Sequence, residues 1–332
     1  MLLRSLLLKS FKMVSLVVIV ALAGVAPAIA VGPTSNIPDW LQAHVGKGNG
    51  QIAPVVLERA RALYLEKVAE GVVKNPCYLA MDATRPSISG GKLGRRFYVI
   101  CEADKSFRAV SSGYGGGRHL RGIANFRNGR QCARHFSNAL GSRLTTGGPY
   151  VTAEAITSFK GYYRVSGKKT APFLRTFIQF DGEGDTMNAR PREIGGHPAV
   201  LLRARCRKKD PDSPYANKDG YVPFGKLVNY AAGRSSGCTS WTASASETII
   251  PMLKGDPTTL YIYPESGDIE AVVQAVKAKK SLSKAGVYWN ASCLRHIGSP
   301  KFWPKEKLGP IIAKYKKDHP PGPSRPLPIC RR

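Results

Sequence analysis

The chain has 332 residues, with 50 Lys and Arg against 22 Asp and Glu, which gives a formal net charge of +28. This length is enough for one good-sized domain with extensions. A basic chain can bind nucleic acid, but the sequence has no RNA-binding aromatic motif and no zinc-finger spacing, and its basic residues are scattered. For an exported chain, such a charge favours an anionic envelope polymer or membrane surface as the partner, and no nucleic acid.

The first thirty residues are predicted to be a secretory signal peptide. A basic start, MLLRSLLLKSFKM, precedes the apolar stretch 14–30, which ends in an A-x-A cleavage pattern. An uncleaved membrane anchor is the alternative, but the apolar run is short for a span and Pro27 breaks its end. No later segment is long and apolar enough to cross a bilayer. We therefore expect an exported protein of the periplasm or cell envelope.

Residues 31–50 are expected to form an irregular lead-in to a main domain over 51–264. Near its start, apolar residues recur at helical spacing between Ala53 and Gly71, which predicts an amphipathic helix packed on the core. The runs CYLAMDA (77–83) and RRFYVICEA (95–103) flank a loop and are predicted to pair as neighbouring strands. Cys77 and Cys101 would then lie close enough for a disulfide.

Further strand-like runs follow, separated by glycine-rich loops such as GYGGG and TTGGPY. They are FRAVSSG (107–113), TFIQF (176–180), PAVLLRA (198–204) and TTLYIYP (258–264). No regular alternation of strands and helices suggests a doubly wound sheet. The predicted fold class is mainly β with a few helices.

From Glu265 the composition changes, and residues 265–332 are expected to form a basic, proline-rich C-terminal extension. SGDIEAVVQAVKAKK (266–280) predicts a basic helix, whereas HPPGPSRPLPICRR (319–332) cannot form a regular helix or a central strand. The late Cys330 suggests that the tail is pinned, and chain order alone favours Cys293 as its partner.

The chain has seven cysteines, so at least one cannot pair within it. Export permits disulfides, and the absence of C-x-x-C argues against a thioredoxin-like redox site or a zinc ribbon. Six cysteines can pair in 15 ways, so the connectivity stays open.

Cys238 lies in the small-residue turn GRSSGCTSW (233–241), and it is either half of a disulfide or a nucleophile. A nucleophilic cysteine needs a stabilised thiolate, a base, and donors for the oxyanion that forms. Gly237 allows close approach of a substrate, and the N–H groups of Gly237 and Cys238 can face the oxyanion. Ser235 and Ser236 add hydroxyl groups, and Arg234 adds positive charge.

A histidine is the expected base. His197, in REIGGHPAVLL, directly precedes an apolar strand, where a ring can project from a rigid edge. A hydrogen-bonded structural histidine is the alternative. The other five lie in the lead-in, in loops or in the extension.

Four segments in chain order resemble the catalytic domain of the murein L,D-transpeptidase family. They are HFSNALGSRLTTGGPYVT (135–152), ARPREIGGH (189–197), GRSSGCTSW and TTLYIYP, and the likeness extends from about Pro54 to Pro264. The resemblance implies an L,D-transpeptidase-like β-sandwich with Cys238 as nucleophile and His197 as base. It also implies that a backbone carbonyl orients the histidine, and that the substrate is the stem peptide of peptidoglycan.

The same resemblance suggests further site residues. Arg192 corresponds to the family's Arg-x-Ile segment, while Ser235, Ser236 and Gly237 form the turn before the nucleophile. The remaining candidate substrate contacts are Arg234, Ser137, Asn138, Ser142 and Tyr114. No cofactor or metal is expected, since FDGEGD (180–185) is similar to a calcium loop only in composition.

Three departures from the family motivate a second hypothesis. Ser236 stands where relatives often carry histidine or tryptophan, and Tyr114 where they often carry histidine. The separation of His197 from Cys238 is also long, because of the polar segment RCRKKDPDSPYANKDGY (205–221), which we predict to be a surface loop. The alternative to an enzyme is therefore a catalytically inactive peptidoglycan-binding module.

Overall fold

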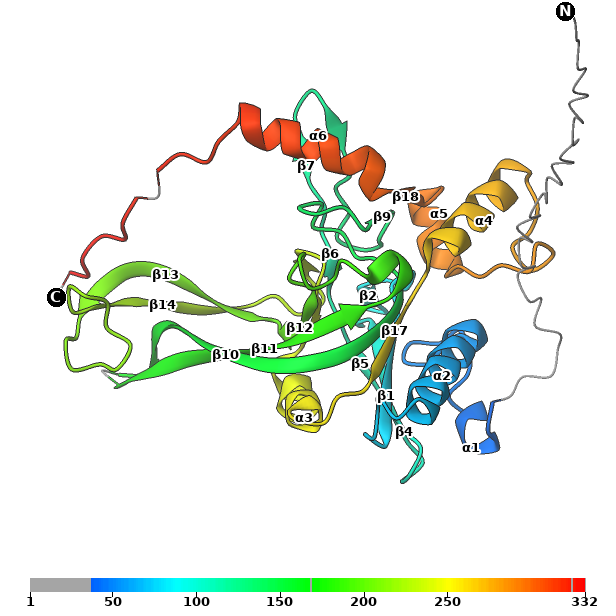
Figure 1. Cartoon of the computed structure of the whole chain (residues 1–332), viewed down its shortest axis with the longest axis horizontal. Helices are drawn as coiled ribbons and strands as arrows, with labels where there is room; N and C mark the ends of the chain where they lie inside the picture. The colour runs from blue at the N-terminus through cyan, green and yellow to red at the C-terminus, as the bar shows by residue number, and fades with distance from the viewer. Residues whose placement is uncertain (1–36, 168, 324, 332) are drawn as a thin grey trace, which may run out of the picture. The chain divides into compact units, whose positions relative to one another are not determined.

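The computed structural model describes residues 37–331 with the exception of 168 and 324, so the predicted signal peptide lies outside the described residues (Figure 1). More of the described chain lies in strands than in helices, which confirms the mainly β class. The helices are α1 (Asp39–Gln42), α2 (Pro54–Ala69), the short 3-10 helix η1 (Gly184–Thr186), α3 (Ala243–Leu253), α4 (Ser266–Lys277), α5 (Ala291–Ile297) and α6 (Lys305–Asp318).

The largest sheet includes a path of hydrogen-bonded strands in the order β16-β12-β11-β10-β17-β1-β4-β5, with β14 attached to β10 and β13 to β14. These strands are β1 (Cys77–Asp82), β4 (Arg95–Cys101), β5 (Ser106–Ser111), β10 (Gly148–Ser166), β11 (Lys169–Gly182), β12 (Gly195–Pro198), β13 (Val200–Lys209), β14 (Tyr221–Asn229), β16 (Thr239–Trp241) and β17 (Thr259–Tyr263).

Four pairs of short strands accompany it: β2 (Ile88–Ser89) with β3 (Lys92–Leu93), β6 (Tyr114–Gly115) with β15 (Arg234–Ser235), β7 (His119–Leu120) with β8 (Ala124–Asn125), and β9 (His135–Ser137) with β18 (Lys301–Trp303).

The three strands β1, β4 and β17 form the centre of the fold and are buried on both faces. Successive side chains of a strand point to opposite faces. Leu79 and Met81 accordingly join one apolar cluster, whereas Tyr78 and Ala80 join another. The predicted pairing of β1 with β4 is confirmed, with Cys77 opposite Cys101 and a disulfide between them.

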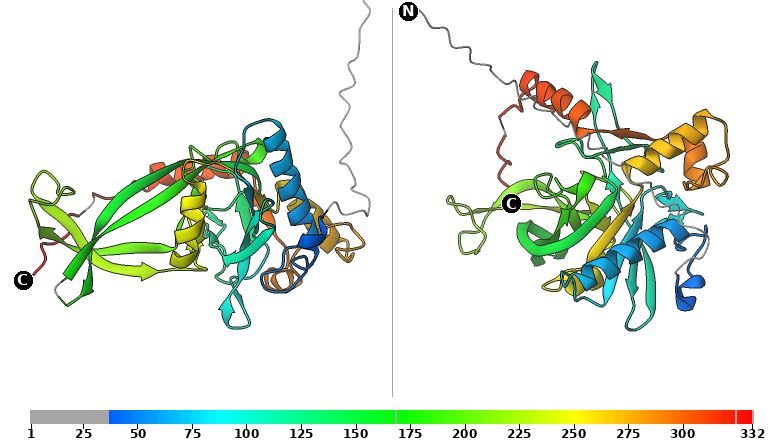
Figure 2. Two further views of the ribbon diagram at one scale, coloured as in Figure 1. Left: turned by 90° about the horizontal axis from the view of Figure 1, so that it is seen from below. Right: turned by 45° about the vertical axis from the view of Figure 1, so that its right-hand side comes forward.

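Helices cover both faces of these central strands. The predicted helix at 53–71 is confirmed as α2, which buries Leu57 and Leu63 against β1 and β17 (Figure 2). The other face is covered by α3 and α4, through Ile249 and Val272. The core therefore lies on both sides of β1, β4 and β17.

Strands β10, β11, β13 and β14 extend away from this core as two long hairpins, which we call the arm (Figures 1 and 2). β10 and β11 pair antiparallel along most of their length, as do β13 and β14. The two hairpins meet where β10 and β14 run parallel, with Tyr162 opposite Phe224.

The arm corrects the prediction of a surface loop at 205–221. Residues up to Lys209 continue β13, and Tyr221 already begins β14, so only 210–220 connects the strands. From Val200 to Lys209 exposed positions alternate with less exposed ones over the first seven residues. The segment 205–221 was predicted as a loop because it is polar and rich in Pro, Asp and Asn, but its first five residues continue the strand.

The helices α4 and α6 of the predicted extension pack against the rest of the described chain. Ile269 and Val272 of α4 lie in the main core, and Leu308 and Ile312 of α6 pack with Leu120 and Phe126. The prediction that Cys330 pairs with Cys293 is wrong. Cys293 is joined to Cys132, and Cys330 to Cys206 of β13. The tail is thus pinned to the arm, where Cys330 N–H also donates to the Arg207 carbonyl.

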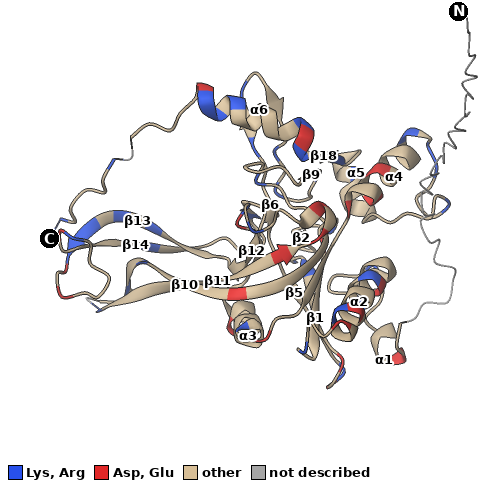
Figure 3. Cartoon of the chain, viewed as in Figure 1, with Lys and Arg blue, Asp and Glu red and all other residues tan. Residues whose placement is uncertain are grey.

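Lysine and arginine are spread over many elements, including β13, α2 and α6 (Figure 3). Three disulfides are compatible with an exported protein. Within the described residues, no helix combines the length and the apolar character that a membrane span requires.

Candidate active site

Cys238 lies in a tight turn between two short strands, each of which is paired to another part of the chain. β15 before it pairs with β6, and β16 after it pairs with β12. Gly237 between them has φ 118°, and a Cβ there would stand 2.7 Å from Ile194 Cδ1 and 2.9 Å from the Leu144 carbonyl oxygen. Glycine is therefore required at this position, and the turn fixes the direction of the Cys238 side chain.

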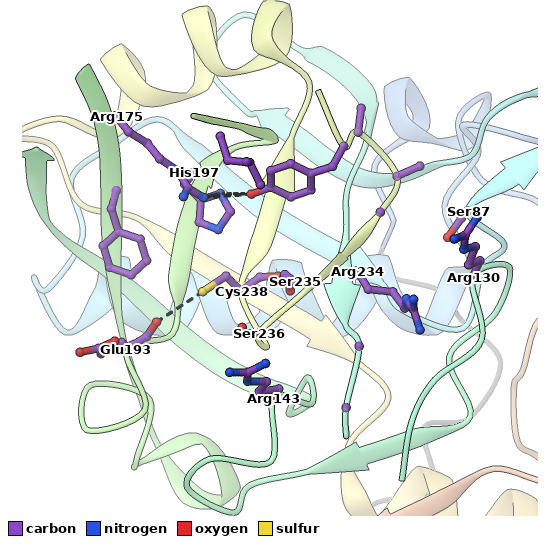
Figure 4. Close-up of a pocket in the computed structure, with 18 of the residues that line it drawn as sticks. Ser87, Arg130, Arg143, Arg175, Glu193, His197, Arg234, Ser235, Ser236 and Cys238 are labelled. Carbon is purple, nitrogen blue, oxygen red and sulfur yellow. Dashed lines mark hydrogen bonds between the residues drawn. The ribbon is translucent and has the colours of Figure 1, made fainter. Parts of the chain in front are cut away.

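Strand register brings His197 to the same place. His197 is opposite Ser240 in the parallel pairing of β12 with β16. Cys238 precedes Ser240 by two residues, so a regular strand would point it to the same face. The strand spacings put the Cα atoms of Cys238 and His197 about 8 Å apart. Both side chains reach the same cavity, as Figure 4 shows.

The cavity has a volume of about 1280 Å³ and lies between the arm and the turn that carries Cys238. Its walls are strongly cationic, and Glu193 is the one acidic residue among the described residues that line it. The cationic side chains in the lining are Arg127, Arg130, Arg143, Lys160, Arg175, Arg192 and Arg234. Such a site attracts an anionic ligand.

Cys238 is the free cysteine of the described chain, and its side chain is 8% exposed. Its thiol donates to the Glu193 carbonyl oxygen at 3.3 Å. Burial raises the pKa of Cys238, and this is opposed by the Gly195 N–H group and by the charges of Arg175 and Arg192. The sulfur is thus a protonated thiol whose thiolate would be stabilised by two nearby arginines.

His197 is buried at 7% exposure, and its Nδ1 atom has several polar neighbours. Arg175 Nη2 lies 2.6 Å from it and the Pro198 carbonyl oxygen 3.0 Å from it. The Tyr230 hydroxyl lies 3.4 Å from Nδ1 and accepts from Arg175 Nη2 at 2.9 Å. Burial, and then the charge of Arg175, lowers the pKa of His197 to about 4, so the ring is neutral near pH 7.

Several residues predicted for the site do line the cavity: Arg192, Arg234, Ser235 and Ser236 join Cys238 and His197 there. Arg192 donates to the Leu144 carbonyl oxygen at 2.7 Å and also to Thr146 Oγ1. The N–H group of Gly237, a predicted oxyanion donor, instead donates to Ser235 Oγ at 3.1 Å.

Ser137, Asn138, Ser142 and Tyr114 are buried but do not line the cavity. The two serines and Asn138 organise the segment 137–146 that Arg192 contacts: Ser137 Oγ accepts from the Ala139 N–H group, and Asn138 Nδ2 donates to Asp185. Tyr114 lies in β6, which pairs with β15 before the Cys238 turn; its hydroxyl donates to the Gly129 carbonyl oxygen and Arg96 lies over its ring.

Sequence reasoning missed Arg175 and Tyr230, which both contact His197. Arg175 lies in β11 one residue before the recognised run TFIQF, and Tyr230 directly follows β14. In the sequence, Arg175 directly precedes the predicted strand TFIQF. Nothing in the sequence, however, linked this arginine to His197. No group of three or more His, Cys, Asp or Glu side chains in the described part of the chain could hold a metal ion.

Comparison with models of known protein families, with curated proteins and with solved structures finds no match for this chain.

Proposed function

We propose that this protein is an exported cysteine acyltransferase that acts on peptidoglycan stem peptides through a Cys238 acyl-enzyme. The observation that carries the proposal is an unpaired, buried cysteine in a cationic cavity, with a histidine on the adjacent strand facing the same space. We further propose that the main domain is an L,D-transpeptidase-like β-sandwich. The large sheet with its covering helices is compatible with this fold.

In the proposed reaction, His197 accepts the thiol proton and the Cys238 sulfur attacks the carbonyl carbon of an L-to-D peptide bond. The tetrahedral intermediate collapses, the imidazolium gives its proton to the leaving amine, and D-alanine departs. An amine of a second stem peptide then displaces the sulfur and forms a crosslink. Water in place of that amine gives L,D-carboxypeptidation from the same acyl-enzyme.

Charge supports this substrate class. Stem peptides carry carboxylates, and the cavity is lined by several arginines, of which Figure 4 labels Arg130, Arg143, Arg175 and Arg234. Arginine binds carboxylates through paired hydrogen bonds. The disulfides and the basic chain fit a location in the periplasm or cell envelope, beside an anionic sacculus.

The test is mass spectrometry of muropeptides incubated with the wild type and with Cys238→Ala. The wild type should release D-alanine and form crosslinked or trimmed products, and Cys238→Ala should form none. The other six cysteines are disulfide-bonded, so Cys238 is also the expected site of a covalent acyl adduct in intact-protein spectra. Equal product from both proteins would rule out the proposed reaction.

A catalytically inactive peptidoglycan-binding module is the second candidate. The contacts of Cys238 and His197 favour this candidate, because both groups already have polar partners within the protein. The Cys238 thiol donates to the Glu193 carbonyl oxygen, and His197 Nδ1 faces Arg175. This candidate predicts salt-dependent retention on purified sacculi that Cys238→Ala leaves unchanged, and no turnover of muropeptides by the wild type.

A further inference from the structure

The Nδ1 atom of His197 has two close partners that it cannot satisfy at once. Arginine has only donors, so the contact with Arg175 Nη2 requires a lone pair on Nδ1. The Pro198 carbonyl oxygen has only lone pairs, so that contact is attractive only when Nδ1 carries a proton. Nδ1 can therefore make only one of these two hydrogen bonds at a time, either with Arg175 at 2.6 Å or with the Pro198 carbonyl oxygen at 3.0 Å.

These two states differ in what the other ring nitrogen can do. While Arg175 donates to Nδ1, the neutral ring carries its proton on Nε2 and has no free lone pair to accept a thiol proton. When Nδ1–H donates to the Pro198 carbonyl, Nε2 becomes an acceptor. The thiol of Cys238 donates to the Glu193 carbonyl oxygen, as expected for the first state. In this first state the pair of Cys238 and His197 has no base.

Arg175 also has an unused donor. Its Nε atom is buried and has no hydrogen-bond partner among the described residues, although a buried unpaired donor is costly. The residue itself lines the cavity. Adjacent N–H groups of a guanidinium match the two oxygens of a carboxylate. If the guanidinium turns toward the cavity, a carboxylate can pair with the buried Nε and a terminal nitrogen, and it then competes with His197 for these donors.

We propose that Arg175 is a carboxylate-docking residue whose capture by the substrate releases His197 to act as the base. This inference rests on the proposed roles of Cys238 and His197. The bound carboxylate pairs with Arg175, Nδ1 takes up a proton from solvent while Nε2 loses one to solvent, and Nδ1–H donates to the Pro198 carbonyl. The Cys238 proton then moves to Nε2, which leaves a thiolate and an imidazolium. An empty site stays protected, and a filled site becomes nucleophilic.

Alkylation of Cys238 by neutral iodoacetamide tests this without any peptidoglycan. The rate is followed by intact-protein mass spectrometry at constant ionic strength, with N-acetylglycine as the carboxylate probe and N-acetylglycinamide as its uncharged counterpart. We expect N-acetylglycine to accelerate alkylation at saturation by about 5-fold or more, the lower end of typical coupling between sites. N-acetylglycinamide should have no effect.

The sign of this effect is diagnostic. A carboxylate that merely bound near Cys238 would raise the thiol pKa and slow alkylation. Arg175→Gln and His197→Ala should each abolish the acceleration, while Arg203→Gln, which removes an exposed arginine of the arm, should retain it. No acceleration in the wild type, or an undiminished acceleration in Arg175→Gln, would overturn the proposal.

A second measurement needs only the wild type, so it does not depend on how the variants fold. The ¹⁵N chemical shifts of the His197 ring distinguish the two neutral tautomers. We expect the Nε2–H tautomer without the probe and the Nδ1–H tautomer with N-acetylglycine, and an unchanged tautomer would contradict the proposal. Neither readout requires turnover, so failure of the peptidoglycan reaction and failure of the Arg175 mechanism are separately detectable.

Discussion

The central strands and the arm are both β-structure, but they are built from different side chains. β1, β4 and β17 have nearly every side chain buried, and both of their faces join apolar clusters. β10, β11, β13 and β14 are mostly half-buried or exposed, with Lys160 and Arg175 among the residues that face the cavity.

This difference separates stability from chemistry. Apolar burial on both faces makes the central strands the main source of stabilisation, at roughly 25 cal/mol per Å² of apolar surface removed from water. The arm contributes less of such burial and instead supplies the polar groups around His197. Substitutions in the two regions should therefore affect different measurements.

The largest expected effect is on turnover. His197→Ala should lower kcat/KM for a muropeptide by about 10²–10⁴-fold, the usual contribution of a general base. The exposed His319 in the tail is the matched control, and His319→Ala should leave the rate unchanged. Steady-state kinetics on a defined stem peptide provide the measurement, and wild-type turnover by His197→Ala would remove this residue from the mechanism.

Truncation of an apolar side chain should lower the free energy of unfolding much more in the central strands than in the arm. Leu79 in β1 is fully buried, so Leu79→Ala should lower the free energy of unfolding by about 2–5 kcal/mol. Leu201 in β13 is 37% exposed, and Leu201→Ala should change it by less than about 1 kcal/mol. Urea denaturation measures both, and similar losses would mean that the arm shares the core's role in stability.

The same contrast explains what could be predicted from the sequence. The apolar runs of β1, β4 and β17 and the helical spacing of α2 identified these elements, because each is specified by its own burial. The first part of β13 was predicted as a strand, but residues 205–209 were assigned to a loop because they are polar and precede a segment rich in Pro, Asp and Asn. Cys238 and His197 were predicted from their local segments, and the structure brings both to one cavity.

Arg175 was missed for a related reason. It approaches His197 only because β11 pairs with β12, and β12 in turn pairs with the strand that follows Cys238. Such a contact between distant segments leaves no local pattern in the sequence. The connection of Cys330 to Cys206 is similar, since chain order favoured Cys293 while the tail in fact runs beside β13.

Two buried histidines should make stability depend on pH. Burial is the main cause that lowers the pKa values of His197 and His135 to about 4 in the folded chain, below the ordinary value of 6.5. Between these values the unfolded chain binds protons that the folded chain does not. Stability should thus fall as pH decreases from about 6.5 to about 4, by up to about 3 kcal/mol for each histidine.

Urea denaturation at about pH 7 and about pH 4.5 measures this loss. Carboxylates also titrate near the lower value, so each variant is compared with the wild type. His135→Gln should reduce the loss, because His135 accepts from Trp303 Nε1 in the packed body of the protein and has no part in the proposed chemistry. An identical loss in His135→Gln and the wild type would show that His135 does not titrate as described.

The smallest expected effect concerns Tyr230, at the base of the arm. Its hydroxyl accepts from Arg175 Nη2 at 2.9 Å and so helps to hold the guanidinium beside His197. Tyr230→Phe removes one hydrogen bond worth about 0.5–1.5 kcal/mol. If the carboxylate competes with this contact, the N-acetylglycine concentration that gives half-maximal acceleration of Cys238 alkylation should fall by about 2- to 12-fold.

Tyr162→Phe is the matched control, because the Tyr162 hydroxyl forms a hydrogen bond with Ser213 in the arm. A half-maximal concentration that rises in Tyr230→Phe would mean that Tyr230 helps to bind the carboxylate, and the arm would then serve the ligand directly rather than through Arg175.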